Sequence, residues 1–569
     1  MTTPEAVDRS QSLSPIYALA DKYVQESCAL DPIRATAIGV PGYDDRLTDH
    51  SPEGVEARAE LDQETAVALA ALEREDGRDD LAAAYLVDRL ESALAFVDAE
   101  EHLRSIRNLG SPVQSVRQVF DLMPRVTDGD WEIIARRMRA VPAALDGIRA
   151  SLRVGIERDL TAARRQALEV AEQTFTWAGE RGTPAFFEQL ASQATGIDGV
   201  TSELLLELDE AALSASMAYA SMGTFLRDEY APVATEQDAV GRDRYAFWAR
   251  SFLGAELDLD ETYAWGWSEL ELIEARMAEI AEQIRPGAGI DATIEWLETE
   301  SDFVIEGEDN LRRWLQDLMD QTIDAMNGTH FDIPGPVQRV EAMIAPHGGA
   351  AAMYYSGPSE DFTRPGRTWY PTLGKTRFPL WGEKSIAYHE GVPGHHLQIG
   401  QVRYLKDQLS RFQRGSTISG HAEGWALYAE RLMLELGYLD EPAYELGMWR
   451  AQAMRAVRVI VDIGMHLELP IPAGQPFHPG ETWTPALGQE FVDARARFPR
   501  DFMASEIVRY LGLPGQAICY KVGERVWLEG RAAAELRHAD SFDLKRFHSY
   551  ALDLGPLGLD RLHTELAKF

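Results

Sequence analysis

Apolar residues recur at helical spacing along most of this chain. In residues 14–30, SPIYALADKYVQESCAL, and in residues 261–284, ETYAWGWSELELIEARMAEIAEQI, apolar positions three and four apart mark one face and polar residues fill the other. Asp31-Pro32 marks a turn or the start of a new helix between such segments. The pattern predicts a mainly α-helical fold.

The pattern changes near residue 325. From Gly328 to Pro371, short apolar runs are separated by glycine and proline: HFDIPGPVQRVEAMIAP, AAMYYSGP and GRTWYPT. Such runs predict short strands and a small β-sheet. We therefore expect an N-terminal helical region, 1–325, and a second region, 326–569, with helical lobes that interleave.

The stretch YHEGVPGHHLQ, Tyr388 to Gln398, concentrates residue types that bind metals. In H-E-x-x-H zinc hydrolases, two histidines one helical turn apart bind zinc, and the glutamate between them activates water. His389 and Glu390 match the start of that motif. The fourth residue after His389 is Pro393, so the standard spacing fails.

Helix geometry limits which histidine joins His389. A straight helix turns about 100° and rises about 1.5 Å per residue, so His395 would point away and His396 would lie about 10 Å along the axis. A two-residue bulge after Glu390 would restore the spacing of one helical turn between two histidines, with His395 as the second ligand and His396 as its neighbour. The alternatives are His396 as the ligand, or a loop with incidental histidines.

Proline and glycine make that bulge plausible. Pro393 lacks a backbone donor, and its ring clashes with the carbonyl four residues back in a regular helix. Gly391 and Gly394 adopt unusual backbone angles at little cost. The insert therefore predicts a local break in the helix.

The segment GHAEGWALYAERLMLELG, Gly420 to Gly437, supplies a candidate third ligand. Its apolar stripe predicts a helix, with Ser419 as the N-cap and Gly437 as the stop. Thermolysin-like zinc hydrolases take a third ligand, a glutamate, from a helix further along the chain, and Glu423 has that position. A carboxylate in a first helical turn also stabilises the helix dipole, which is the alternative role of Glu423.

Two later segments carry further candidates. In RAVRVIVDIGMH, Asp462 and His466 lie four apart on a predicted helix; they could support a metal site, or simply satisfy each other. In RYLGLPGQAICYKVG, Tyr520 could stabilise the oxyanion that forms during amide hydrolysis, or could be a buried structural tyrosine.

Candidate substrate-binding residues complete the set. Lys521 could bind a substrate carboxylate. Arg364 and Arg367 could do the same, or could be ordinary surface arginines. Tyr510 and Gln516 are the remaining candidates for substrate contact.

The motifs YHEGVPGHHLQ and EGWALYAERL, with the two later segments, resemble the bacterial family known as domain of unknown function 885. The resemblance covers roughly the last third of the chain. Members look like distant relatives of mostly helical zinc peptidases, such as thimet oligopeptidase and bacterial metallocarboxypeptidases. Those enzymes also carry Gly-His-x-Leu, as Gly394 to Leu397 does here. The insert before Gly394 departs from their pattern and leaves open which histidine binds.

The resemblance implies a deep cleft between helical lobes and short peptides as substrates. It also implies a small sheet beside the catalytic helix, with an edge strand that binds the substrate backbone by strand addition. Ala351 to Ser356, or Thr368 to Tyr370, could be that strand.

Charge and composition exclude several other classes. The 569 residues carry a formal charge of −37, which disfavours nucleic acid and anionic membranes as partners. The charge would attract basic peptides, or simply keep the protein soluble. No run of 18 apolar residues predicts a membrane span, and no secretory signal is visible. Cys28 and Cys519 form no metal or redox motif, so we expect a cytoplasmic protein.

We therefore expect a zinc hydrolase of peptidase type. His389, His395 and Glu423 hold zinc, Glu390 takes the proton of the attacking water, and Tyr520 shares the oxyanion with the metal. Two alternatives remain: a zinc hydrolase of a non-peptide amide or ester, and a non-catalytic binding protein on this scaffold. The presence of both glutamates argues against the binding protein, which would need neither.

Overall fold

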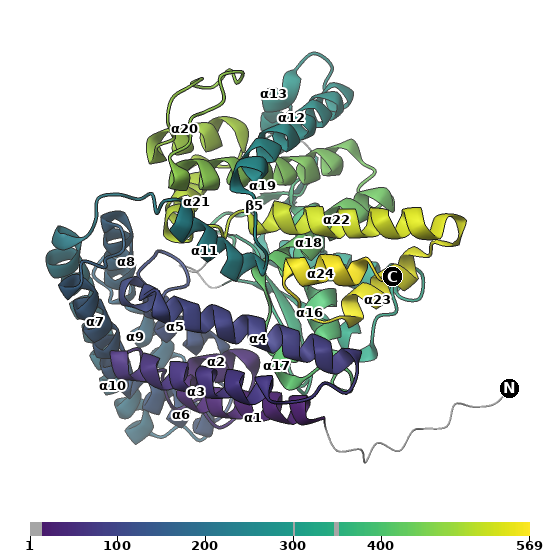
Figure 1. The fold of residues 1–569 in the computed structure, drawn as a ribbon. Helices are drawn as coiled ribbons and strands as arrows, with labels where there is room; N and C mark the ends of the chain where they lie inside the picture. Colours follow the sequence, from purple (N-terminus) through teal and green to yellow (C-terminus); the bar gives the residue numbers. More distant parts are fainter. Residues whose placement is uncertain (1–13, 300–301, 346–351) are drawn as a thin grey trace.

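The computed structural model describes residues 14–299, 302–345 and 352–569. Helices hold 66% of the residues and strands 5%, which confirms the mainly α-helical prediction. Figure 1 shows the first helices, in purple and blue, gathered on one side of the molecule. They are α1 (Pro15–Leu30), α2 (Pro32–Ile38), α3 (Pro52–Ala70), α4 (Gly77–Asp98), α5 (Pro112–Gln118), α6 (Asp128–Arg139), α7 (Val141–Glu157), α8 (Arg164–Trp177), α9 (Phe186–Ser192) and α10 (Ser202–Phe225).

The later helices, in teal, green and yellow, form the rest of the molecule (Figure 1). They are α11 (Arg242–Leu253), α12 (Leu259–Ile284), α13 (Gly289–Thr299), α14 (Glu308–Met326), α15 (Glu383–Glu390), α16 (His395–Tyr404), α17 (Arg411–Arg414), α18 (Ser419–Glu435), α19 (Pro442–Leu467), α20 (Pro485–Arg495), α21 (Arg500–Gly512), α22 (Cys519–His538), α23 (Leu544–Asp553) and α24 (Leu559–Leu566).

Local capping explains several of the boundaries. Asp31 caps α2 by accepting a hydrogen bond from the Arg34 amide, so Asp31-Pro32 does start a new helix. Gly437 follows α18 with a φ of +84°, a conformation that favours glycine, and so ends that helix as predicted. The start of α18 differs from the prediction, because Ile418 is the N-cap residue and Ser419 is already helical.

The buried apolar residues form three main cores. One joins residues of α1–α4 with Phe412 and Ile418, a second lies within residues 106–234, and the largest runs from Tyr245 to Leu566. The expected boundary at residue 325 falls inside the largest core, because α12 packs along α19. Phe412, from the second expected region, packs edge-on against Tyr23 of the first region, with ring centroids 5.4 Å apart. The two expected regions thus share cores.

The strands form two small sheets. Strands β2 (Val340–Ile344), β4 (Gly366–Tyr370) and β3 (Tyr354–Ser356) form one sheet in that order, with β2 and β4 parallel and β3 antiparallel to β4. Strands β1 (Val304–Glu306) and β5 (Arg377–Pro379) form an antiparallel pair.

The sheet order corrects one prediction. Thr368 to Tyr370 is not an edge segment, because β4 is hydrogen-bonded on both sides. The other candidate, Ala351 to Ser356, begins at a residue outside those that the structure describes. Its described part contains β3, which does lie at an edge.

Two glycines set the crossing of α18 and α22. A Cβ atom added to Gly424 would collide with the backbone of Gly523, and one added to Gly523 would collide with the carbonyl of Gly420. The helices therefore approach backbone to backbone, which only glycine permits. This crossing brings Glu423, next to Gly424, close to Tyr520, one turn before Gly523.

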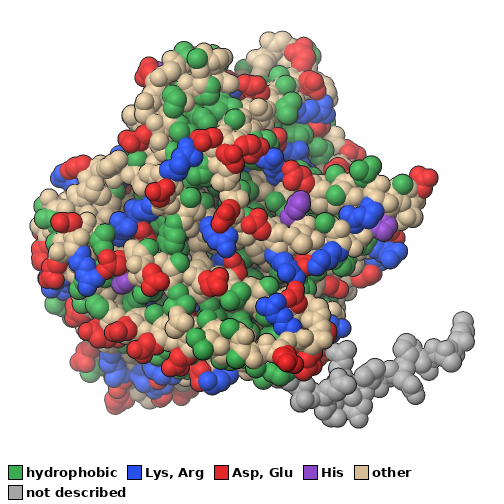
Figure 2. Space-filling view, viewed as in Figure 1, with side chains coloured by type: hydrophobic (Ala, Val, Ile, Leu, Met, Phe, Trp, Pro, Cys, Tyr) green, Lys and Arg blue, Asp and Glu red, His purple; other side chains and the backbone are tan. Residues whose placement is uncertain are grey.

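On the face shown in Figure 2, acidic and basic side chains are interspersed rather than segregated. Many charged residues at the surface form ion pairs. Arg525, for example, lies 3.0 Å from Glu261. Within the described part of the chain, no helix combines the length and the apolar character that crossing a bilayer requires.

Candidate metal centre

The chain breaks between the two halves of the histidine motif. Helix α15 ends at Glu390 and α16 begins at His395, so the insert is a turn between two helices rather than a bulge within one. The Gly394 amide donates to the Tyr388 carbonyl at 3.1 Å and closes the turn. A Cβ at Gly394 would collide with the His389 carbonyl, so this turn requires glycine.

The turn directs His395 back towards His389. Their rings lie 4.8 Å apart, centroid to centroid, and are nearly perpendicular at 86°. From α18, the Oε2 atom of Glu423 lies 3.3 Å from Nε2 of His389 and 3.5 Å from Nε2 of His395. The structure thus brings together the three predicted ligands.

The spacing of these three atoms fits a metal ion. Around a tetrahedral zinc with bonds of about 2.0–2.1 Å, neighbouring ligand atoms lie about 3.3 Å apart. Oε2 of Glu423 is buried and forms no hydrogen bond within the described residues, although two imidazole nitrogens face it. Across the described ranges, this is the one group of three or more such side chains with ligand atoms close enough to share an ion.

Glu430 orients His389, and sequence reasoning gave it no role. Its Oε1 accepts a hydrogen bond from Nδ1 of His389 at 2.8 Å, and its Oε2 accepts one from the Ser385 hydroxyl at 2.7 Å. Glu430 is fully buried two turns after Glu423 on α18. A carboxylate on the far nitrogen of a metal-binding histidine fixes the tautomer and makes the histidine a better ligand.

The electrostatics of the centre favour a bound cation. Burial alone would lower the pKa of His389, but the nearby carboxylates of Glu423 and Glu430 raise it to about 9. Burial raises the pKa of Glu390, whereas the two imidazoles hold the pKa of Glu423 well below its usual value. Three carboxylates thus surround two imidazoles, with Arg455 3.6 Å from one of the carboxylates, Glu430, and a metal cation would balance the remaining negative charge.

His396 points away from this centre. Its Nε2 donates to the Val337 carbonyl at 2.7 Å, and its Nδ1 accepts from the Tyr355 hydroxyl at 3.0 Å. Burial lowers the pKa of His396 to about 4, so it stays neutral. Tyr355 lies on β3, so His396 joins α16 to the sheet, and His395 is the histidine that faces His389.

Tyr520 lies beside the centre, as predicted. Its ring stacks on that of His389 at 21°, with centroids 6.4 Å apart. The guanidinium carbon of Arg458 lies 4.5 Å from the centroid of the same ring. Burial raises the pKa of Tyr520, so its hydroxyl keeps its proton and remains a donor.

Lys521 and Tyr510 have structural partners in place of the substrate contacts that the sequence suggested. The Lys521 ammonium donates to Glu269 at 2.7 Å and to Gln452 at 3.0 Å. The Tyr510 hydroxyl donates to Glu506 at 2.8 Å and accepts from Arg458. Both side chains are fully buried.

Asp462 and His466 form their hydrogen bonds with residues other than the three metal ligands. Oδ2 of Asp462 accepts from the Tyr245 hydroxyl at 2.7 Å and from the Gly515 amide at 2.9 Å. Nε2 of His466 donates to the Tyr510 carbonyl at 3.0 Å. These bonds join α19 to α11, α21 and the turn before α22, whereas Glu430 is the residue that hydrogen-bonds to His389.

Of the three remaining candidates, Arg364 and Gln516 lie in loops and Arg367 lies on β4. Arg364 donates to the Gly357 carbonyl at 3.2 Å, and burial lowers its pKa. Arg367 pairs with Glu341 at 2.9 Å, so it is a structural residue of the sheet. Gln516 lies in the turn before α22, where its Oε1 is buried without a hydrogen-bond partner among the described residues.

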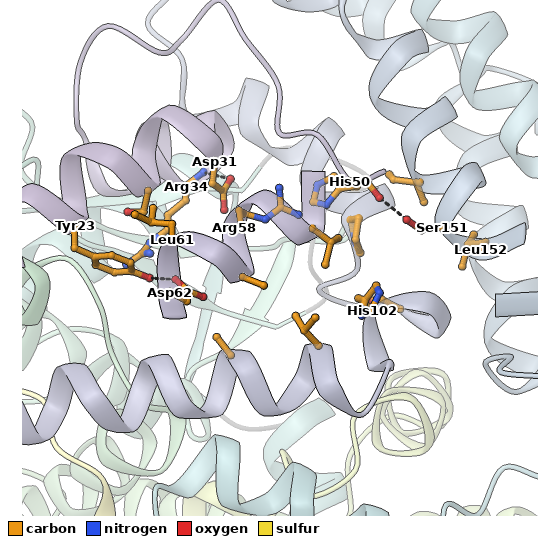
Figure 3. Close-up of a pocket in the computed structure, with 18 residues that line it drawn as sticks. Tyr23, Asp31, Arg34, His50, Arg58, Leu61, Asp62, His102, Ser151 and Leu152 are labelled. Carbon is orange, nitrogen blue, oxygen red and sulfur yellow. Dashed lines mark hydrogen bonds between the residues drawn. The ribbon is translucent and has the colours of Figure 1, made fainter. Parts of the chain in front are cut away.

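A separate cavity of about 330 Å³ lies among the N-terminal helices (Figure 3). Asp31, Arg58, Asp62, His50 and His102 are among the residues that line it. None of the residues of the metal centre borders this cavity. Its histidines and acids do not form a metal-binding group in the described part of the chain.

Comparisons with known proteins agree on a family and a fold. Two solved structures superpose over nearly the whole chain, and both are described as putative lipoproteins. The one from Colwellia psychrerythraea has a TM-score of 0.84 and 21% identity, and the match covers 98% of this chain and 99% of that one. The one from Shewanella oneidensis, described as of unknown function, has a TM-score of 0.72 and 16% identity, with 97% and 99% covered. These identities establish a shared fold alone.

No curated protein matches the chain. The family model described as "Bacterial protein of unknown function (DUF885)" matches residues 32–566, far more than the last third in which the sequence motifs lie. The chain therefore belongs to the DUF885 family of bacterial proteins.

Proposed function

We propose that this protein is a zinc-dependent hydrolase that cleaves short peptides. The observation that carries the proposal is the spacing of His389, His395 and Glu423, whose three ligand atoms lie within 4.8 Å of one another. Two histidines and a glutamate are the ligands of thermolysin-type zinc sites, which leave a fourth position for water. Glu390 follows His389 directly, as the general base does in those sites.

Zinc bound there would polarise the scissile carbonyl and acidify water. Glu390 takes the proton of the attacking water and passes it to the leaving amine. Its burial supports this role, because a raised pKa brings a carboxylate closer to the range that suits proton transfer at neutral pH. Tyr520 donates a hydrogen bond to the oxyanion that forms when water adds to the carbonyl.

The resemblance of the motifs to helical zinc peptidases supports this proposal. The proposal includes short peptides as substrates and a cytoplasmic location. The metal ligands and Glu390 are each less than a fifth exposed, so a folded protein would not reach them easily. Cys28 and Cys519 are both free and buried, which suits a reducing compartment.

The test compares two glutamate variants on the same preparations. Glu390→Gln keeps the metal ligands but removes the base, so kcat should fall by about 10²–10⁴-fold while zinc content stays near one per chain. Glu423→Gln removes a ligand, so zinc and activity should both fall. Glu435→Gln, at an exposed position of α18 paired with Arg531, is the control and should change neither.

Substrate screening completes the test. Peptides, simple amides and esters are offered to the zinc-loaded protein, and products are identified by mass spectrometry. Peptide cleavage that Glu390→Gln abolishes supports the proposal. Cleavage of only non-peptide amides or esters would redefine the substrate. A protein that takes up no transition metal would overturn the proposal.

A further inference from the structure

Three arginines lie near Tyr520, and we call them the arginine cluster: Arg455 and Arg458 on α19, and Arg509 on α21. Arg455 and Arg458 are 5% and 4% exposed, and the Arg509 side chain is 14% exposed. The guanidinium carbons of Arg458 and Arg455 lie 4.5 and 5.9 Å from the centroid of the Tyr520 ring.

The arginine cluster carries more positive charge than its partners balance. Glu506 is the carboxylate that it shares, 2.6 Å from Nη2 of Arg458 and 3.3 Å from Nη2 of Arg509. Glu430 lies 3.6 Å from Nη2 of Arg455, but it already accepts hydrogen bonds from His389 and Ser385. Buried charge without a partner is costly, so this surplus calls for an anion.

The cluster also has unused hydrogen-bond donors. Nε and Nη1 of Arg455, Nη1 of Arg458 and Nε of Arg509 are buried without a hydrogen-bond partner among the described residues, and Nη2 of Arg509 has only its ion pair with Glu506. Guanidinium groups bind carboxylates through paired donors, which gives both strength and orientation. The chemistry of the site therefore fits a carboxylate.

The cluster lies at a definite distance from the metal centre. The centroid of the Tyr520 ring is 6.4 Å from that of the His389 ring and 4.5 Å from the guanidinium carbon of Arg458, so the His389 ring and this guanidinium are at most about 11 Å apart. Extended peptide advances about 3.3 Å per residue, so no more than about three residues fit between the two groups.

We propose that the arginine cluster binds the C-terminal carboxylate of a peptide, so that the protein removes one to three residues from the C-terminus. This inference rests on the proposed hydrolase function. Water adds to the scissile carbonyl, the C–N bond breaks, the new carboxylate keeps the water oxygen, and the amine leaves with the proton. Tyr520 is close both to His389 and to the two arginines of α19, so its hydroxyl can serve the scissile carbonyl of a peptide bound in this way.

The experiment uses two mixtures of random pentapeptides, one with free C-terminal carboxylates and one with C-terminal amides. The zinc-loaded protein should cleave the free acids about 100-fold more efficiently than the amides, and only at the last three bonds. In Arg509→Gln and Arg455→Gln this preference should fall to less than about 10-fold. Arg525→Gln, whose partners are Glu261 and Glu529 at the surface, should retain it.

A measurement of peptide binding distinguishes failure of this inference from failure of the proposed hydrolase function. Equilibrium dialysis of both mixtures against zinc-loaded Glu390→Gln measures retention without turnover. If acids and amides are cleaved equally, the inference is wrong and the hydrolase stands. If the acids are selectively retained but the unmodified protein never cleaves them, the hydrolase is wrong and the carboxylate site stands. If peptides are neither retained nor cleaved, both are wrong.

Discussion

Nδ1 of His389 lies 2.8 Å from Oε1 of Glu430, and both side chains are buried. A carboxylate only accepts, so Nδ1 carries a proton, and when Nε2 gives up its own proton its lone pair points towards Glu423 and His395. This arrangement is the form of histidine that binds a metal. It also ties the orientation of the ring to α18, which supplies both glutamates.

Glu430→Gln should weaken zinc binding without removing a ligand. The amide oxygen can still accept from His389, but the negative charge that makes the imidazole a better ligand is lost. Substitutions of such supporting carboxylates typically cost 10–100-fold in metal affinity, and we expect a loss of about that size. Competition with a chromogenic zinc chelator measures the affinity, and Glu435→Gln on the same helix is the matched control. An unchanged affinity would show that Glu430 acts only in packing.

His395→Ala and His396→Ala should have different effects. His395→Ala removes a ligand and should abolish stoichiometric zinc. His396→Ala should keep zinc but leave the buried Val337 carbonyl without its donor, at a cost of about 1–3 kcal/mol of stability. Zinc content and the unfolding midpoint are measured on both proteins. The opposite pattern of zinc loss would transfer the ligand role to His396.

Short-range chemistry in the sequence predicted the parts of the centre that lie within one motif. His389 and Glu390 match a known pattern, and Pro393 forces a break wherever it stands in a helix. The nature of the break was less predictable, because a bulge and a turn between two helices both satisfy the proline. Contacts with Met319, which a Cβ at Gly391 would overlap, are set by the tertiary structure.

Long-range partners explain most of the differences. Lys521 pairs with Glu524, three residues later on α22, but its other two partners, Glu269 and Gln452, are distant in sequence and could not be predicted. Glu430 looked like one of many helical acids, and only its complete burial distinguishes it. The one available signal was its position two turns after Glu423, on the face that α18 directs at α15.

Gly424→Ala should destabilise the protein, and it should affect Tyr520 more than the two histidine ligands. The added methyl group meets the backbone of Gly523, so α18 and α22 must move apart. Overpacking of this kind costs about 1–3 kcal/mol, and the better helix propensity of alanine offsets up to about 1 kcal/mol. Gly474→Ala is the control, because its new Cβ meets no atom within 4 Å. A lower unfolding midpoint only in Gly424→Ala is the expected result.

The same substitution should lower kcat more than it lowers zinc affinity. The crossing positions Tyr520 against the metal centre, whereas His389 and His395 are held by α15 and α16. Zinc content near one per chain with reduced turnover would support this division. Loss of zinc in proportion to activity would contradict it, because the crossing would then position Glu423 rather than Tyr520.

Asp462→Asn should change how stability depends on pH. Burial raises the pKa of Asp462 to about 7 in the folded protein, and the side chain ionises near 4 when unfolded. Its contribution to stability is therefore fully present below about pH 4 and is lost as the pH rises to about 7, at ~1.4 kcal/mol per pH unit. Asparagine keeps an oxygen for Tyr245 and the Gly515 amide but does not ionise. The variant should thus gain stability relative to the unmodified protein as the pH rises from 5 to 7.

Urea unfolding midpoints at pH 5, 6, 7 and 8 measure this difference. The comparison must be made between proteins at each pH, because His466, whose pKa burial lowers to about 4, titrates with the opposite sign between about pH 4 and 6.5. That contribution is common to both proteins and cancels in the difference. Asp243→Asn, on the exposed face of α11, is the control and should follow the unmodified protein. A constant difference from pH 5 to 8 would mean that Asp462 is already ionised in the fold, with a counter-charge that its contacts with Tyr245 and Gly515 do not supply.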